Sequence, residues 1–105
     1  MIARRFTAWA TAENARAYTS FFESTLSPKL RQLAGHAGAM VLNRTDGGLT
    51  EITVMTFWES MESIEHFAGS TVGKAVIEPE ARALFASVSH EVTHHEVMLD
   101  TLTGA

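Results

Sequence analysis

The chain has 105 residues and a formal charge of −4; 46% of its residues are hydrophobic and 19% are charged. This is the length of one domain, and the composition is that of a globular chain rather than a disordered one. The absence of cysteine excludes disulfides and thiolate nucleophiles. The acidic balance argues against nucleic-acid binding, and no apolar run approaches the ~20 residues of a membrane span. With no apolar secretion signal in residues 1–6, we expect one cytoplasmic domain over residues 1–105.

The first third of the chain predicts a strand followed by an amphipathic helix. Residues 2–9 alternate, which is typical of a strand with two different faces. Thr11 is a suitable N-cap for the helix. Apolar residues then recur every three or four positions, at Ala15, Tyr18, Phe22, Leu26, Leu30 and Leu33. Pro28 is expected to interrupt this helix because proline lacks the N–H that helical bonding needs.

The rest of the chain predicts a hairpin, a second helical region and a closing strand. Residues 39–44 and 49–58 suit two strands joined by the turn 45–48, whose glycines tolerate positive φ. Ser60 can cap a second helix, which the apolar pattern extends through Val76. Pro79 then opens a further turn or two of helix, ending near residue 85. Residues 91–99 close the domain as a strand.

The element order β-α-β-β-α-β indicates an α+β fold with a ferredoxin-like antiparallel sheet and helices on one face. Strand 49–58 carries apolar side chains on both faces, with Ile52, Val54 and Trp58 on one and Met55 and Phe57 on the other. An apolar sheet face without helices commonly marks an interface, so we expect a homodimer. The alternative is that loops or the C-terminal tail cover this face.

The five histidines are the side chains that titrate near neutral pH when unperturbed. His94 and His95 are neighbours on a strand, so their side chains point to opposite faces. His90 and His94 are separated by about 13 Å along a strand, too far to share one ion. His66 and Glu62 have the i, i+4 spacing that a two-ligand site or an exposed pair would use. We expect no metal site.

Two further groups of residues point to a binding site. The aromatic side chains Trp9, Tyr18, Phe22, Trp58 and Phe67 could line a pocket between sheet and helices, or simply form the core. Arg4 and Arg5 are neighbours on a strand, so one of them must point inward. A buried arginine needs a carboxylate partner or a bound anion, and Glu51, Glu96 or a partner subunit could supply the carboxylate.

Residues 57–69 read Phe-Trp-Glu-Ser-Met-Glu-Ser-Ile-Glu-His-Phe-Ala-Gly and follow an alternating strand. This segment resembles the antibiotic biosynthesis monooxygenase family, in which a strand ends in Trp and a Ser-capped helix follows. Residues 1–4, 75–84 and 93–97 resemble further parts of the family pattern, so the similarity covers essentially the whole chain. The resemblance implies a dimeric α/β barrel, in which two ferredoxin-like sheets pack face to face.

Activity transfers less well than fold, because function depends on the site. The branch similar to the actinorhodin-pathway monooxygenase oxidises polycyclic phenols with O₂ and without a cofactor. That branch has an Asn four residues before the strand-end Trp and a Tyr six after it. This chain has Trp58, but Val54 and Ile64 stand at those two positions.

A second branch, the staphylococcal-type haem-degrading enzymes, uses an Asn, a Trp and a haem-ligating His. The matching positions hold Thr7, Phe67 and Ile77, so a haem role is the least favoured. The resemblance thus suggests a cofactor-independent monooxygenase acting on an electron-rich aromatic or polyketide-like molecule. The alternative is a non-catalytic small-molecule-binding or accessory dimer of the same fold.

The monooxygenase hypothesis needs a base or an oxyanion stabiliser. We expect His94, and after it His66, as the base, with Trp58 shaping the cavity, because an indole only donates hydrogen bonds. The expected substrate pocket consists of Thr7, Trp9, Tyr18, Phe22, Val54, Ile64 and Phe67.

Overall fold

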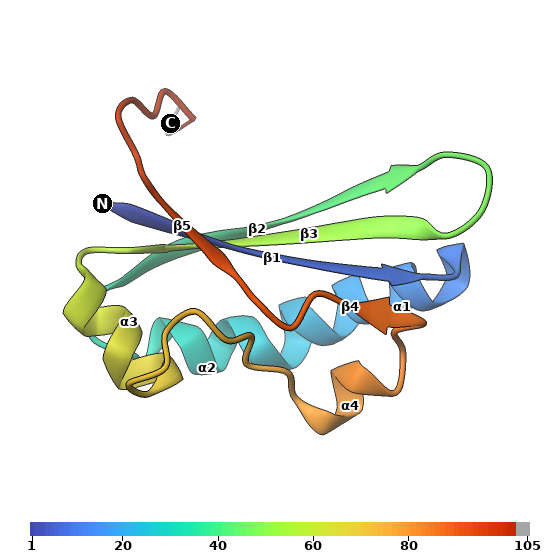
Figure 1. Ribbon diagram of the computed structural model, residues 1–105, viewed down its shortest axis with the longest axis horizontal. Coiled ribbons are helices and arrows are strands. Elements are labelled where there is room, and N and C mark those ends of the chain that lie inside the picture. Colours follow the sequence, from blue (N-terminus) through green and yellow to red (C-terminus); the bar gives the residue numbers. More distant parts are fainter. Residues whose placement is uncertain (103–105) are drawn as a thin grey trace.

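The computed structural model describes residues 1–102. In chain order the elements are β1 (Ile2–Ala10), α1 (Ala12–Phe21), a π-helical turn η1 (Phe22–Leu26), α2 (Ser27–Arg31), β2 (His36–Thr45), β3 (Thr50–Trp58), α3 (Met61–Ala68), α4 (Pro79–Arg82), β4 (Ser87–Val88) and β5 (Thr93–Glu96). The strands form one antiparallel sheet in the order β2-β3-β1-β4, and β5 also pairs with β1. Figure 1 shows the helices together on one side of this sheet. The predicted α+β, ferredoxin-like fold is therefore confirmed.

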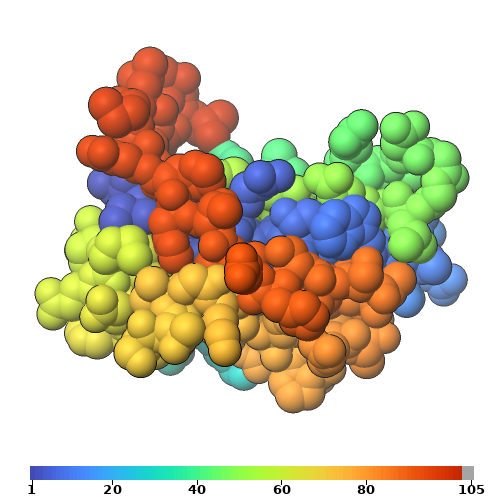
Figure 2. Space-filling view, in the orientation of Figure 1, coloured from blue at the N-terminus to red at the C-terminus, as the bar shows by residue number. Residues whose placement is uncertain are grey.

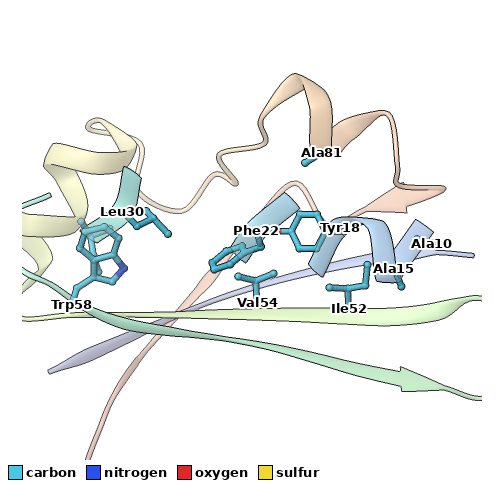
Figure 3. Packing of buried hydrophobic residues seen from close by; sticks show 10 residues of the cluster. Ala10, Ala15, Tyr18, Phe22, Leu30, Ile52, Val54, Trp58 and Ala81 are labelled. Carbon is cyan, nitrogen blue, oxygen red and sulfur yellow. The ribbon is translucent and has the colours of Figure 1, made fainter. Parts of the chain in front are cut away.

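Strand alternation decides which side chains meet the helices. Along β3 every second residue, from Thr50 to Trp58, is buried, and the residues between them are half-buried. In the register with β1, Trp58 lies opposite Ile2 and Val54 lies opposite Phe6. The side chains of one parity therefore form the core, as Figure 3 shows for Ile52 and Val54. Those of the other parity form the open face of the sheet.

The helix after β1 is interrupted before Pro28, as predicted. Thr11 caps α1, its Oγ1 accepting a hydrogen bond of 3.1 Å from the N–H of Asn14. The chain then widens into η1, where the N–H of Ser27 bonds to the carbonyl of Phe22, five residues back. Pro28, which lacks an N–H, follows directly and begins the first turn of α2. Phe22 and Leu26 both turn toward the sheet and line the space beneath it.

The predicted extension of the second helix through Val76 is wrong. α3 ends at Ala68 because Gly69 adopts φ +81°, a conformation that glycine tolerates best, and its N–H bonds to Glu65 O at 2.8 Å. The following segment pairs with the chain before β5 instead. The Ala75 N–H donates to the carbonyl of residue 90 at 2.9 Å, and the N–H of residue 92 donates to the carbonyl of residue 73 at 2.8 Å. An irregular segment, not a helix, covers this part of the core.

The end of the chain also differs from the prediction. The closing strand is shorter than residues 91–99, and a second short strand, β4, precedes it. Both pair with β1, whose length leaves room for two successive partners. β2 begins at His36, three residues earlier than expected. Beyond β5 the chain leaves the sheet on the side opposite the helices (Figure 1), with Met98 83% and Leu99 82% exposed.

Within residues 1–102, no helix is long and apolar enough to cross a membrane.

Candidate functional site

A cavity of about 240 Å³ lies between the sheet and the helices. Most of its wall is apolar, and three charged residues also contribute to it. It is lined by Arg4, Phe6, Tyr18, Phe22, Leu26, Lys29, Leu30, Leu33, Val54, Thr56, Phe67, Val76, Ile77, Glu78, Ala81, Phe85 and Val92. Concave apolar sites with a few polar groups are typical of small-molecule binding.

Aromatic rings form one wall of the cavity. The Tyr18 ring lies 5.0 Å from that of Phe85 and 6.1 Å from that of Phe22, centroid to centroid, and Phe6 lies 6.0 Å from Phe85. Figure 3 shows Tyr18 and Phe22 reaching from the helices toward Val54 on the sheet. Burial raises the pKa of Tyr18 well above its usual range. The phenol therefore stays protonated and can donate a hydrogen bond but cannot act as a base.

Arg4 is the inward-pointing member of the Arg4–Arg5 pair and is only 4% exposed. Its Nη1 donates to the carbonyl of Val72 at 2.6 Å, and its Nη2 donates to that of Lys74 at 2.8 Å. The guanidinium carbon lies 5.8 Å from the centroid of the Phe67 ring, a cation–π distance. Arg4 thereby ties the irregular segment after α3 to the sheet.

The carboxylate partners predicted for a buried arginine are not at Arg4. Over residues 1–102 the ion pairs are those of Arg44, which lies 3.6 Å from Asp46 and 4.0 Å from Glu51. Glu96 is exposed and lies opposite Ile2 in the sheet register. Burial lowers the pKa of Arg4, but a guanidinium remains charged in proteins. Backbone carbonyls and a histidine thus take the place of the expected carboxylate.

That histidine is His94, which lies directly opposite Arg4 in the pairing of β1 with β5. Its Nε2 is 3.0 Å from Arg4 Nη1. Arginine only donates hydrogen bonds, so Nε2 must accept, and the imidazole is neutral with its proton on Nδ1. Burial lowers the pKa of His94, and the charges of Arg4 and His95 lower it further. The ring lies behind Arg4 and is not part of the cavity wall.

Some of the predicted pocket residues line the cavity, and the others lie on the open face of the sheet or in the core. Those that line the cavity are Tyr18, Phe22, Val54 and Phe67. Thr7 and Trp9 do not line this cavity, because they have the opposite strand parity to Phe6 and lie on the open face of the sheet. Ile64 is fully buried in the core and does not reach the cavity.

Trp58 supports the cavity from behind. It is fully buried, and its Nε1–H donates to Thr56 Oγ1 at 2.9 Å. Its ring stacks on that of Phe67, with the ring centroids 5.2 Å apart, and packs edge to face with His36, with the centroids 4.9 Å apart. Because Phe67 is a wall residue, Trp58 shapes the cavity through it.

His66 does not fit the predicted role of a base. Its side chain is exposed on α3 and does not line the cavity, although the neighbouring Phe67 does. A histidine in that position has no path for proton transfer to a ligand in the cavity.

Sequence reasoning did not assign Glu78, Lys29 or Phe85 to a site. Glu78 and Phe85 flank the short helix α4, and their approach to the cavity depends on the path of the irregular segment before it. Local pattern carries no signal for such a path. Lys29 belongs to the helical stretch with the periodic leucines, so that periodicity could have placed it near the pocket edge. In residues 1–102 no group of three His, Asp or Glu side chains could hold a metal ion.

No family model and no curated protein matches the sequence. Solved structures do match. Rv0793 from Mycobacterium tuberculosis superposes with a TM-score of 0.60 at 17% identity, over 95% of this chain and 97% of that one. A Bacillus cereus protein, provisionally named an antibiotic biosynthesis monooxygenase, gives a TM-score of 0.56 at 17% identity over 94% of both chains. The chain therefore has the fold of antibiotic biosynthesis monooxygenases, which confirms the resemblance at the level of the fold.

Proposed function

We propose that this chain is a cofactor-independent monooxygenase that oxidises an electron-rich aromatic molecule with O₂. The observation that carries the proposal is an apolar cavity with one buried guanidinium, Arg4, in its wall and a neutral histidine, His94, bonded to that guanidinium. A deprotonated phenol or enol can pass an electron to O₂ directly. A largely apolar cavity favours this reaction because electrostatic stabilisation by fixed groups is stronger away from water.

In this proposal Arg4 and His94 divide the acid–base work. His94 does not line the cavity, but its Nε2, the unprotonated nitrogen, lies 3.0 Å from Nη1 of the cavity-lining Arg4. When Arg4 Nη1 turns from that nitrogen to the oxygen of a substrate O–H at the Arg4 end of the cavity, Nε2 is freed to take the proton as the negative charge develops on the substrate oxygen. Burial, with the charges of Arg4 and His95, lowers the pKa of His94 from its usual value, which favours the neutral imidazole that a base needs at pH 7.

The oxidation then balances without an added reductant. An anthrone-like substrate, deprotonated to its enolate, gives one electron from its reacting carbon to O₂, and the substrate radical and superoxide combine to form a C–O bond. The peroxide anion takes back the proton that His94 accepted. The resulting hydroperoxide loses water across its O–O and C–H bonds. The CH₂ group becomes a carbonyl that retains one oxygen atom, and the other oxygen atom leaves as water.

Oxygen uptake with an anthrone-like substrate tests the proposal. We expect His94→Gln to lower kcat at least ~100-fold while the chain stays folded, because the amide cannot take the proton. His66→Gln is the matched control, since His66 is exposed outside the cavity, and its rate should not change. Glu78→Gln tests the carboxylate in the cavity wall. A rate that survives His94→Gln but is lost in Glu78→Gln would move the base to Glu78.

One observation favours the second candidate, a non-catalytic small-molecule-binding protein. The acceptor nitrogen of His94 already takes a hydrogen bond from Arg4, and Tyr18 is held as a neutral phenol. A cavity in which the base remains occupied binds its ligand without reaction. Stoichiometric binding of the aromatic compound, recovered unchanged after incubation in O₂-saturated buffer, would establish this function and exclude the first.

We further propose that the protein acts as a cytoplasmic homodimer joined through the open face of the sheet. That face carries Trp9, Met40, Leu42, Met55 and Phe57, and Leu42 is 46% exposed. Figure 2 shows the C-terminal segment and the β2–β3 turn standing out on this side of the sheet, with a hollow between them. A second copy of the chain could fill this hollow, since the exposed apolar side chains of one copy would meet those of the other.

A further inference from the structure

The hydrogen bonds of Arg4 leave part of its guanidinium unused. Of its five N–H groups, two on Nη1 serve Val72 O and His94 Nε2, and one on Nη2 serves Lys74 O. The Nε–H and the second Nη2 N–H have no acceptor within residues 1–102. Arg4 lines the cavity, so a ligand in the cavity could supply the missing acceptors.

The charge of Arg4 is also uncompensated. No carboxylate in residues 1–102 lies within 4.0 Å of its guanidinium. An isolated buried charge is costly unless a partner offsets it. Two backbone carbonyls offer dipoles but no opposite charge. Although Glu78 contributes a carboxylate to the cavity wall, Arg4 therefore has no counter-charge within ion-pair distance in residues 1–102.

We propose that the Arg4 end of the cavity is an oxyanion subsite, which binds one acidic oxygen group, a carboxylate or a phenolate, of a planar aromatic ligand. This inference rests on the proposed function in taking the same cavity as the ligand site and Arg4 as the group that faces the ligand oxygen. A guanidinium is suited to such a group because its paired N–H groups match the geometry of a carboxylate. The aromatic body of the ligand lies against Phe6, Tyr18, Phe22 and Phe85.

The cavity also limits which anions fit. Its 240 Å³ correspond to the liquid volume of about eight waters. This space suits a compact ligand of about two or three fused rings. Glu78 contributes a negative charge to the wall, which disfavours a ligand with a second acidic group. The exposed Lys29 adds a positive charge to the wall and is the other cation that could attract an acid.

Calorimetric titration under nitrogen tests the subsite with three probes of one shape: 2-naphthoate, 2-naphthamide and 2-naphthol at pH 7. We expect 2-naphthoate to bind at least about tenfold more tightly than the neutral amide, since hydrogen bonds between two charged groups are stronger than those to a neutral group. If the subsite also takes phenolates, 2-naphthol should show its phenolate absorbance band on binding at pH 7. Equal affinity for acid and amide, with 2-naphthol bound as the neutral phenol, would overturn the proposal.

Variants then identify the cation. Arg4→Met should abolish the preference for the acid, and Arg4→Lys should retain part of it because the charge remains but the paired donors do not. Lys29→Met is the matched control and should keep the full preference. Loss of the preference in Lys29→Met alone would overturn the assignment to Arg4. Arg4→Met could fail to fold, because Arg4 also holds the segment at Val72 and Lys74. In that case the affinities of the wild type and of Arg4→Lys for 2-naphthoate and 2-naphthamide still test the proposal.

The binding test and the oxygen test fail independently. Acid-selective binding without oxygen uptake would leave the subsite standing and reject the monooxygenase. Equal binding of 2-naphthoate and 2-naphthamide, together with oxygen uptake from an anthrone-like substrate that is lost in His94→Gln, would reject the subsite and leave the monooxygenase standing.

Discussion

Arg4 Nη1 donates a 3.0 Å hydrogen bond to His94 Nε2, across the pairing of the first strand with the last. The bond fixes the imidazole as neutral with its proton on Nδ1, since the guanidinium has no lone pair to offer. It also links the closing strand to the residue whose side chain holds the segment between α3 and α4. Protonation of His94 would remove the acceptor and place two positive charges side by side.

The stability of the protein should therefore fall at mildly acidic pH. Burial lowers the pKa of His94, and the charges of Arg4 and His95 add to this; burial also lowers that of His36. The folded pKa lies below the unfolded value of about 6.5, so near that pH the unfolded chain binds more protons. The contribution of the neutral His94 and His36 side chains to the free energy of unfolding is fully present above pH ~6.5. It is lost as the pH falls through their pKa values in the folded protein.

Denaturant unfolding at a series of pH values measures this effect. His94→Gln, which keeps a hydrogen-bond acceptor and cannot be protonated, should show a smaller loss of stability between pH 7 and pH 5 than the wild type. His90→Gln, at an exposed position, should match the wild type. An identical pH dependence in His94→Gln and wild type would contradict the neutral His94 inferred from the structure.

Gly35 and Gly47 form a matched pair for testing backbone strain. Both have positive φ, +84° and +82°. A Cβ at Gly35 would lie 2.0 Å from Ser63 Oγ, whereas a Cβ at Gly47 would have no neighbour within 4 Å. Gly47→Ala should cost about 1–2 kcal/mol of unfolding free energy from φ alone. Gly35→Ala should cost about 3 kcal/mol or more, because Ser63, whose N–H bonds to the cap of α3, must also move.

Thermal or chemical denaturation of both variants checks this prediction. Equal losses of unfolding free energy in Gly35→Ala and Gly47→Ala would show that Ser63 moves aside at no cost. The close approach of Gly35 to α3 would then contribute nothing to the difference in stability.

The two tryptophans should differ in what their removal does. Trp58→Ala should destabilise the fold by about 3–5 kcal/mol, because Trp58 is fully buried and stacks on Phe67. Trp9→Ala should cost less in the protomer, since Trp9 is half-buried on the open face of the sheet. Denaturant titration measures both, and an equal or larger loss for Trp9→Ala would show that the open face contributes to the core.

The proposed homodimer can be tested at two positions of nearly equal exposure. Leu42 on the open face is 46% exposed, and Val76, which lies on the helix side of the sheet, is 44% exposed. Leu42→Lys should convert a dimer into a monomer of 11.5 kDa, because a buried unpaired charge at the interface is costly. Val76→Lys should leave the dimer intact. Sedimentation velocity at micromolar concentration gives the masses, and a monomeric wild type would reject the dimer.

Local patterns in the sequence were sufficient for the main strands and the first helix. The alternation in residues 50–58 determined which side chains of β3 face the core, because strand side chains point to opposite faces in turn. Thr11 and Ser60 are N-caps, as their position before an apolar helical pattern predicted. The inward position of one of Arg4 and Arg5 also followed from the sequence, since neighbours on a strand cannot both face solvent on a one-sided sheet.

The tertiary structure alone decided what surrounds Arg4. Apolar residues after Gly69 suggested a longer helix, but this segment instead pairs with residues 90–92 and presents its carbonyls to the guanidinium. Glu78 and Phe85 reach the cavity only because that segment takes this path. Periodicity reports which face of a regular element is apolar, whereas an irregular segment is placed by contacts with residues far away in the chain. The arrangement of the cavity, and the missing counter-charge in it, depend on such contacts.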